Sequence, residues 1–201
     1  MGHQDRIVWD NADRYRVMEP LFEGVRVILS YRGERTSPAY VQGISGAAFR
    51  IGGICPCAPT CTAAMATKDL PRILGYDVEA LPFGENDVFE ARGAEIVARV
   101  KDEIRAGRPA LVWHAFTMLE WDVVAGFDEG EHKFLGRGSY AGLEGYAVED
   151  QMRLITERPA LGAILIGEKR RRCSTPTHAR KSLRQQESGS SWKASSATID
   201  E

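Results

Sequence analysis

The chain has 201 residues, of which 43% are hydrophobic and 27% charged, as is usual for a soluble globular domain with at most a short appendage. No apolar run approaches the ~20 residues that a membrane-spanning helix needs, and the N-terminus lacks the apolar core of a signal peptide, so we expect a cytoplasmic protein without a membrane partner. The formal net charge is −2, but residues 169–201 carry +5 and residues 1–168 carry −7, and an acidic body does not indicate nucleic-acid binding.

Helical and extended patterns alternate along the first half of the chain. Apolar residues recur at three- and four-residue steps between Arg14 and Tyr31, which predicts a helix. Pro20 places the start of this helix near Glu19, because proline fits a first helical turn better than a helix interior. The other elements expected in this half are an extended segment over residues 1–13, a helical turn over 37–41, a loop over 43–46, a strand over 47–51, a short helix capped by Asp69 and a strand over 76–81.

The second half contains a strong helix signal and a predicted hairpin. Residues 88–106 have apolar side chains on one face and charged ones on the other, and Gly107 is expected to end this helix. Two runs of β-type residues follow, over 109–113 and 121–127, and Gly126 predicts a bulge or a close backbone approach in the second run. The remaining expectations are a strand over 133–136, a helical turn over 147–152, a buried strand over 161–166 and a disordered, basic, low-complexity tail over 169–201.

Three stretches of the chain carry a resemblance to a known fold. They are Ser30-Tyr31-Arg32-Gly33 followed by residues 43–50, the helix-to-strand segment 106–113, and the segment 120–128, which resembles a family strand of the form His-x-x-Val-Val-x-Gly-Tyr-Asp. Over residues 14–168 the chain is therefore similar to papain-like cysteine peptidases, above all to the bacterial branch related to bacteriocin-leader peptidases and to the N-terminal domain of butirosin-type acyltransferases. The resemblance implies a papain-like α+β domain over residues 1–168, with N-terminal helices packed on an antiparallel sheet.

The resemblance also implies where a catalytic pair would stand, and the chain departs from the family at both places. The family's nucleophilic cysteine heads the first long helix, which corresponds to Glu19-Pro20 here, and no cysteine lies within thirty residues of that point. The family's general-base histidine heads the Val-Val-x-Gly strand, where this chain has Glu120. A papain-type enzyme needs both groups, because the imidazole takes the thiol proton and later returns it.

Three of the four cysteines, Cys55, Cys57 and Cys61, crowd into one proline-containing loop, which is not a disulfide framework. Cys61 is expected at the N-terminus of a helix, where the helix dipole favours a thiolate, so Cys61 or Cys57 is a candidate replacement nucleophile with His114 as its base. The three thiols can alternatively hold a zinc ion if His114, His132 or an acidic residue supplies a fourth ligand. A loop packed by unreactive thiols is the remaining alternative, since buried cysteine commonly behaves as a small hydrophobic residue.

Polar residues of the predicted hairpin form the second candidate group. His114 follows the first strand, where a histidine is either a base or a hydrogen-bonded structural residue. Glu120 and Asp122 alternate with Trp121, so both carboxylates are expected on the strand face opposite Trp121. Two carboxylates in that position can hold a cation, raise one another's pKa, or remain in solvent.

Three hypotheses follow, and they leave open whether the chain is an enzyme. The first is a cysteine-peptidase-like domain without a working catalytic pair, which needs no cofactor and acts as a binding or accessory module for a small molecule or peptide. The second is a thiol-dependent hydrolase or acyltransferase that uses Cys61 or Cys57 with His114, and for which Glu120 and Asp122 are further candidate catalytic residues. The third is a small zinc-binding protein that uses the three clustered cysteines.

Overall fold

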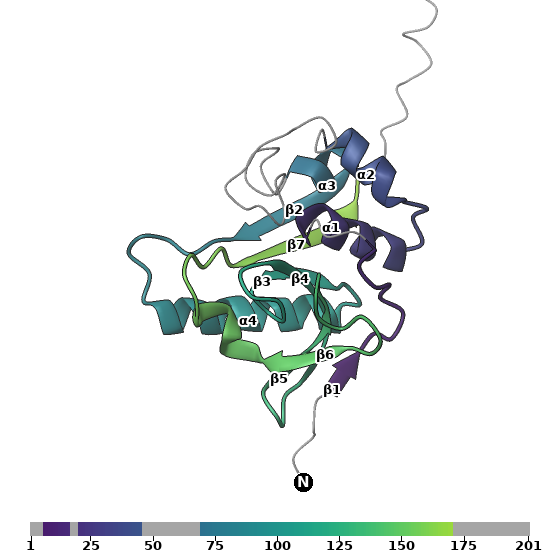
Figure 1. Cartoon of the computed structure of the whole chain (residues 1–201). Helices are drawn as coiled ribbons and strands as arrows, with labels where there is room; N and C mark the ends of the chain where they lie inside the picture. The colour runs from purple at the N-terminus through teal and green to yellow at the C-terminus, as the bar shows by residue number, and fades with distance from the viewer. Residues whose placement is uncertain (1–5, 17–19, 46–68, 171–201) are drawn as a thin grey trace, which may run out of the picture. The chain divides into compact units, whose positions relative to one another are not determined.

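One antiparallel sheet with helices on both faces makes up the part of the chain that the computed structural model describes, residues 6–16, 20–45 and 69–170 (Figure 1). In chain order the elements are β1 (Arg6–Val8), α1 (Pro20–Tyr31), α2 (Pro38–Ile44), α3 (Asp69–Ile73), β2 (Tyr76–Leu81), α4 (Phe89–Arg105), β3 (Ala110–Trp113), β4 (Trp121–Asp128), β5 (Lys133–Arg137), β6 (Ala147–Asp150), the 3₁₀ helix η2 (Gln151–Ile155) and β7 (Ala163–Lys169). All of these elements belong to one compact unit. The architecture is α+β, as the sequence predicts.

The sheet pairs strands that are far apart in the sequence. Its strand order is β2-β7-β3-β4-β5-β6, β1 pairs with the end of β4, and every neighbouring pair is antiparallel. The last strand, β7, lies between β2 and β3, so that Ile164 is opposite Ala80 on one side and Leu111 on the other. The β3–β4 hairpin therefore lies in the interior of the sheet, which explains why every residue of β4 is buried.

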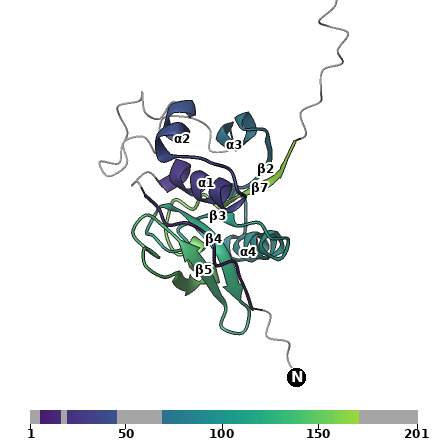
Figure 2. The same cartoon turned by 90° about the vertical axis from the view of Figure 1, so that its right-hand side faces the viewer.

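The side chains of β3 and β4 alternate between two hydrophobic cores. Leu111, Trp121 and Val123 belong to the core that contains α1, whereas Val112 and Val124 belong to the core that contains α4. Figures 1 and 2 show α1 and α4 on these two sides of the hairpin. The alternation decides which face each polar residue of the hairpin meets, because successive side chains of a strand point to opposite faces.

Gly126 lies where β4 is irregular and a second backbone comes close. The register of β4 against β5 shifts between Val124 and Gly126. On the other side of β4, a Cβ at Gly126 would lie 2.6 Å from the carbonyl oxygen of Ile7 in β1. The prediction for Gly126 is confirmed, because a residue with a side chain would not let β1 approach this closely.

Helix α1 is buried along most of its length and carries an ion pair into the core. Glu23 and Arg26 are only 2% and 1% exposed, and the Arg26 guanidinium lies 2.7 Å from Glu23 Oε1. The same guanidinium donates to Asp13 Oδ2 at 3.0 Å and to the carbonyl oxygen of Arg14 at 2.9 Å. Arg26 therefore ties the segment that precedes α1 to the helix itself.

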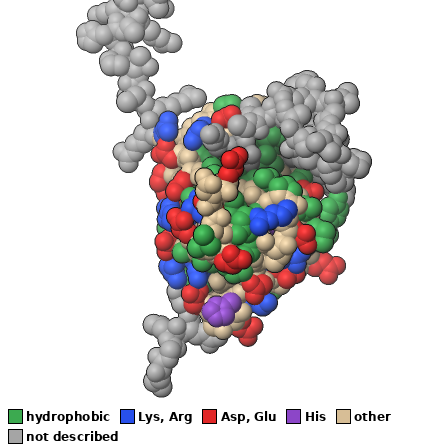
Figure 3. All heavy atoms as spheres, turned by 90° about the vertical axis from the view of Figure 1, so that its left-hand side faces the viewer, with side chains coloured by type: hydrophobic (Ala, Val, Ile, Leu, Met, Phe, Trp, Pro, Cys, Tyr) green, Lys and Arg blue, Asp and Glu red, His purple; other side chains and the backbone are tan. Residues whose placement is uncertain are grey.

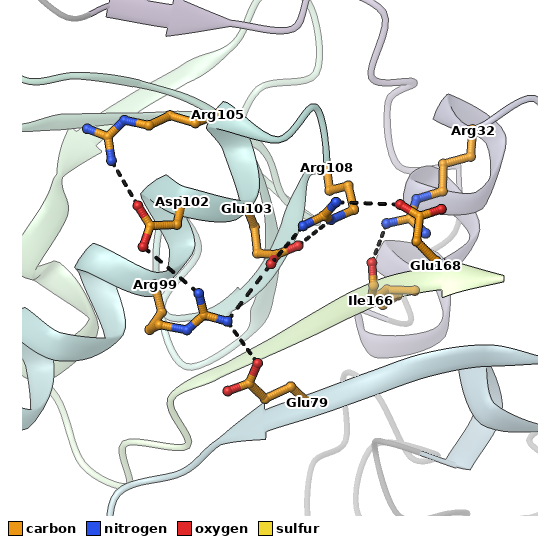
Figure 4. A network of polar contacts seen from close by, with 9 residues as sticks. All are labelled: Arg32, Glu79, Arg99, Asp102, Glu103, Arg105, Arg108, Ile166 and Glu168. Atoms are coloured by element: carbon orange, nitrogen blue, oxygen red, sulfur yellow. Dashed lines mark hydrogen bonds and ion pairs between the residues drawn. The ribbon is translucent and has the colours of Figure 1, made fainter. Parts of the chain in front are cut away.

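Charged side chains join α4 and the residues just after it to the β2–β7 side of the sheet (Figure 4). Arg99 pairs with Glu79 of β2 at 2.9 Å, and Arg108 lies 3.4 Å from Glu168 of β7. Arg32, immediately after α1, donates to two backbone carbonyl groups of β7. Each solvent-exposed ion pair contributes at most about 1 kcal/mol, so the network fixes the orientation of these elements more than it stabilises them.

The structure confirms the predicted helix at 88–106, the hairpin, and the strands at 76–81 and 133–136. The buried strand expected at 161–166 is present as β7, but Lys169, expected to begin the disordered tail, is its last residue. Two other predictions are wrong. Residues 147–152 are not a helical turn but β6 and the beginning of η2, because this segment pairs with β5 along the edge of the sheet. The loop expected at 43–46 begins later, because α2 continues through Ile44 and the N–H of Ser45 still donates to the carbonyl oxygen of Val41. The strand expected at 47–51 lies outside the described residues.

Candidate functional site

The link between β3 and β4, residues 114–120, contains the candidate polar residues and is called the hairpin turn below. Its backbone adopts left-handed φ angles at two non-glycine residues, His114 (58°) and Leu119 (53°). The N–H of His114 donates to the carbonyl oxygen of Glu120 at 2.7 Å, which closes the turn. A left-handed non-glycine residue costs on the order of 1–3 kcal/mol, so other contacts must hold the turn in this conformation.

His114 is buried beneath the turn, and both of its ring nitrogens are hydrogen-bonded. The N–H of Leu119 donates to Nδ1 at 2.8 Å, which places the ring proton of the neutral imidazole on Nε2. Nε2 lies 3.2 Å from Thr156 Oγ1, and this hydroxyl in turn donates to the carbonyl oxygen of Arg153. Burial lowers the pKa of His114, and the positive charge of Arg153 lowers it further. The ring is therefore neutral near pH 7 and connects the hairpin turn to the end of η2.

Asp122 holds the other end of the turn. Its side chain is fully buried, and Oδ2 accepts hydrogen bonds from the backbone N–H groups of Phe116 at 2.7 Å and Thr117 at 2.8 Å. Asp122 follows Trp121, which packs in the α1 core, so its side chain lies on the opposite face, as the sequence predicts. The carboxyl therefore acts on the α4 side of the sheet, away from the beginning of α1.

The second oxygen of Asp122 and the hydroxyl of Thr117 are buried polar atoms beside Gly138. Neither Asp122 Oδ1 nor Thr117 Oγ1 has another hydrogen-bond partner among the described residues. The Thr117 hydroxyl can donate to an ionised Oδ1 or accept from a protonated one, so it suits either state of the carboxyl. Burial, with a smaller contribution from the charge of Glu120, raises the pKa of Asp122 to about 7 in spite of its two backbone hydrogen bonds. Asp122 is thus a buried acid whose protonation changes near neutral pH.

Gly138 is expected to be intolerant of any side chain because it faces this pair. A Cβ there would lie 2.2 Å from Asp122 Oδ1 and 2.4 Å from Thr117 Oγ1, so Gly138→Ala is expected to lower the free energy of unfolding by about 1–3 kcal/mol. Gly145→Ala is the matched control, since no atom lies within 4 Å of a Cβ at that glycine. Urea denaturation of both variants measures the difference. Equal stabilities would show that the carboxyl and the hydroxyl move aside without cost.

Glu120 ends the hairpin turn and precedes β4. It is half-buried, and burial raises its pKa; among the described residues no ion pair holds its carboxylate. Because it lies outside the strand, strand alternation does not bring it onto the same face as Asp122. The structure therefore connects His114 and Asp122 through the backbone of the hairpin turn and leaves Glu120 beside them.

A groove of about 480 Å³ opens next to His114. It is lined by His114 and Met118 of the hairpin turn and by residues between 149 and 157, which include the end of β6 and η2. The volume falls in the range of small-ligand sites, roughly 300–1,000 Å³. The wall formed by η2 is fixed to α4, because a Cβ at Gly93 would lie 2.7 Å from Ile155 Cγ2 and 3.1 Å from Met152 Cε.

The clustered cysteines Cys55, Cys57 and Cys61 lie outside the described residues. Their roles as nucleophile or zinc ligands therefore stay predictions, and so does a pairing of His114 with Cys61 or Cys57. Within the ranges that the structure describes, no three His, Cys, Asp or Glu side chains are arranged to hold a metal ion. In the same ranges no helix has the length and apolar character of a transmembrane span.

Three residues important to this site were not foreseen from the sequence. Thr117 and Gly138 frame the buried carboxyl, and Thr156 receives the hydrogen bond from His114 across 42 positions of the chain. Gly138 and Thr156 each sit in a segment with ordinary turn composition, and only the tertiary fold brings them to the hairpin. The one local signal is Thr117 itself, a hydroxyl residue four positions beyond the end of β3.

The chain was also compared with known proteins. No family model, no curated protein and no solved structure matches it.

Proposed function

We propose that this chain is a non-catalytic binding module built on a papain-like scaffold, and that the groove beside the hairpin turn receives its ligand. The observation that carries the proposal is the hydrogen bonding of His114. Both ring nitrogens are engaged within the protein, so the imidazole would act as a general base only after it gives up one of these bonds. The same bonds make His114 well suited to form a fixed part of the lining of a preformed groove.

The positions expected for a catalytic pair also support this proposal. The Tyr15 hydroxyl donates to the carbonyl oxygen of Trp121 at 2.9 Å and lies against Gly24 in the second turn of α1. The beginning of α1 is therefore close to the beginning of β4, where the papain-like family would pair its cysteine with its histidine. At those places this chain has Pro20 and Glu120, and neither side chain can serve as the expected nucleophile or imidazole base.

The proposal predicts that the protein has no thiol-dependent turnover. The full chain is incubated with fluorogenic peptide amides and with acyl thioesters, with and without prior alkylation by iodoacetamide. We expect no hydrolysis or acyl transfer above the protein-free rate, because no thiolate–imidazolium pair forms. The rate of alkylation of each cysteine near neutral pH is measured in parallel and is expected to match that of an ordinary thiol.

Two results would overturn the proposal in favour of a live cysteine hydrolase or acyltransferase. One is turnover that Cys61→Ala or Cys57→Ala abolishes. The other is a single hyper-reactive cysteine whose reactivity falls when His114 is replaced by glutamine, since that dependence marks a thiolate held by the imidazole.

A further inference from the structure

The groove combines an apolar wall with a fixed polar floor. Met118 of the hairpin turn is 64% exposed, and Met152 and Ile155 of η2 line the same groove. The floor is the hydrogen-bonded pair of His114 and Thr156, which cannot shift unless the hairpin turn changes its backbone. Methionine side chains adapt to ligands of varied shape, so this wall suits an aliphatic group.

Acidic side chains give the groove a negative charge. Glu149 is paired with Arg153 at 3.1 Å, but Asp150 and Glu157 have no ion-pair partner among the described residues. Asp150 uses one oxygen to accept the N–H of Met152 at 2.8 Å, which fixes its carboxylate at the beginning of η2. Figure 3 shows the side of the molecule that carries η2 and the beginning of α4, where acidic side chains lie between exposed hydrophobic ones.

Arg153 is the one arginine among the residues that line the groove. Its guanidinium is paired with Glu149, and its Nε is shielded from solvent. Arg153 therefore does not pair with Asp150 or Glu157.

We propose that the groove binds a short peptide segment in which a lysine or arginine is flanked by aliphatic residues. The cationic side chain meets Asp150 and Glu157, and an aliphatic neighbour packs on Met118 and Met152. This inference rests on the proposed function and adds the chemical class of the ligand. Charge complementarity favours a basic peptide over an acidic one, because an acidic residue would be repelled by the two unpaired carboxylates.

The test uses three capped tripeptides on the full chain at low salt: acetyl-Leu-Lys-Leu-amide, acetyl-Leu-Gln-Leu-amide and acetyl-Leu-Glu-Leu-amide. Carbon-13-labelled methionine methyl groups report binding by NMR, with the signals assigned through Met118→Leu and Met152→Leu. The lysine peptide is expected to shift both signals and to bind about tenfold more tightly than the glutamate peptide, with the glutamine peptide between them. Added salt should reduce this preference.

A pair of charge-matched variants tests whether the groove carries the preference. Glu157→Gln removes an exposed, unpaired carboxylate of the groove and is expected to weaken binding of the lysine peptide about threefold or more. Glu131→Gln makes the same change of charge at an exposed residue of the β4–β5 turn that does not line the groove, and it should leave the dissociation constant nearly unchanged. Both substitutions are at exposed positions, so neither should unfold the protein.

The possible outcomes separate this inference from the proposed function. If the lysine peptide shifts neither signal at about 5 mM, if the glutamate peptide binds equally well, or if the two glutamate variants behave alike, the inference is wrong and the binding module needs another ligand. If the lysine peptide binds and is cleaved or acylated in a thiol-dependent reaction, the proposed function is wrong while the ligand class holds. Binding without turnover supports both.

Discussion

Replacing Arg26 by methionine is expected to lower the free energy of unfolding by about 3–5 kcal/mol, because it leaves the buried Glu23 carboxylate without its counter-ion. Glu23 Oε1 would keep only the backbone N–H of Arg16, and Oε2 already lacks a hydrogen-bond partner. The carbonyl oxygen of Arg14 would lose its donor at the same time. Guanidinium chloride denaturation of the full chain measures the loss.

Two further variants show whether the buried charge is the cause. Arg16→Met removes another arginine that pairs with Asp13, but Arg16 is 59% exposed, so the expected loss is below about 1 kcal/mol. The double variant Glu23→Leu/Arg26→Met replaces the whole pair by apolar groups and should recover at least half of the loss, since apolar replacement of a buried ion pair is often nearly neutral. A double variant as unstable as Arg26→Met alone would mean that packing of the arginine stem, not the unpaired charge, dominates.

The second large effect is expected at Asp122. Asp122→Leu deprives the N–H groups of Phe116 and Thr117 of their common acceptor, and two buried unpaired donors cost about 2–6 kcal/mol together. Asp122→Asn keeps an oxygen for these donors and adds an N–H for Thr117 Oγ1, so it should stay within about 1 kcal/mol of the parent at pH 5. If the two variants were equally unstable, the hydrogen bonds to the turn would not be the source of the effect.

The parent and Asp122→Asn together also test the protonation of Asp122, through the pH dependence of their free energies of unfolding. The folded-state pKa of about 7 lies above the ordinary value, so between these values the folded protein keeps a proton that the unfolded chain has released. The contribution of the Asp122 proton to the free energy of unfolding is therefore full below about pH 4 and is lost as the pH rises through about 7. Relative to Asp122→Asn, the parent should lose roughly 2–3 kcal/mol between about pH 5 and pH 8. A difference that does not change with pH would contradict a raised pKa.

The sequence predicted elements whose signals are local. Helix α4 and strand β2 follow from hydrophobic periodicity and turn residues within their own segments. The sequence of β6 predicts a helical turn because the strand has only four residues and its strand character comes from pairing with β5. A short edge strand carries too few alternating residues to be separated from a turn.

The candidate site likewise contains residues that the sequence indicates and others that it does not. His114 and Asp122 are named from the sequence because they flank the link between two predicted strands, and both hold the hairpin turn. Their actual partners, Thr156 and Gly138, come from later segments that reach the hairpin only through the sheet. The raised pKa of Asp122 depends on complete burial, which no pattern of neighbouring residues encodes.

The placement of β7 between β2 and β3 has a consequence for how the protein is synthesised. A nascent chain that has not yet released residues 163–169 from the ribosome has two open strand edges where the finished sheet has one continuous ladder. Open edges of this kind invite pairing with other chains. The edges of β2 and β3 that β7 covers therefore stay unpaired until β7 emerges, and only then can the sheet close.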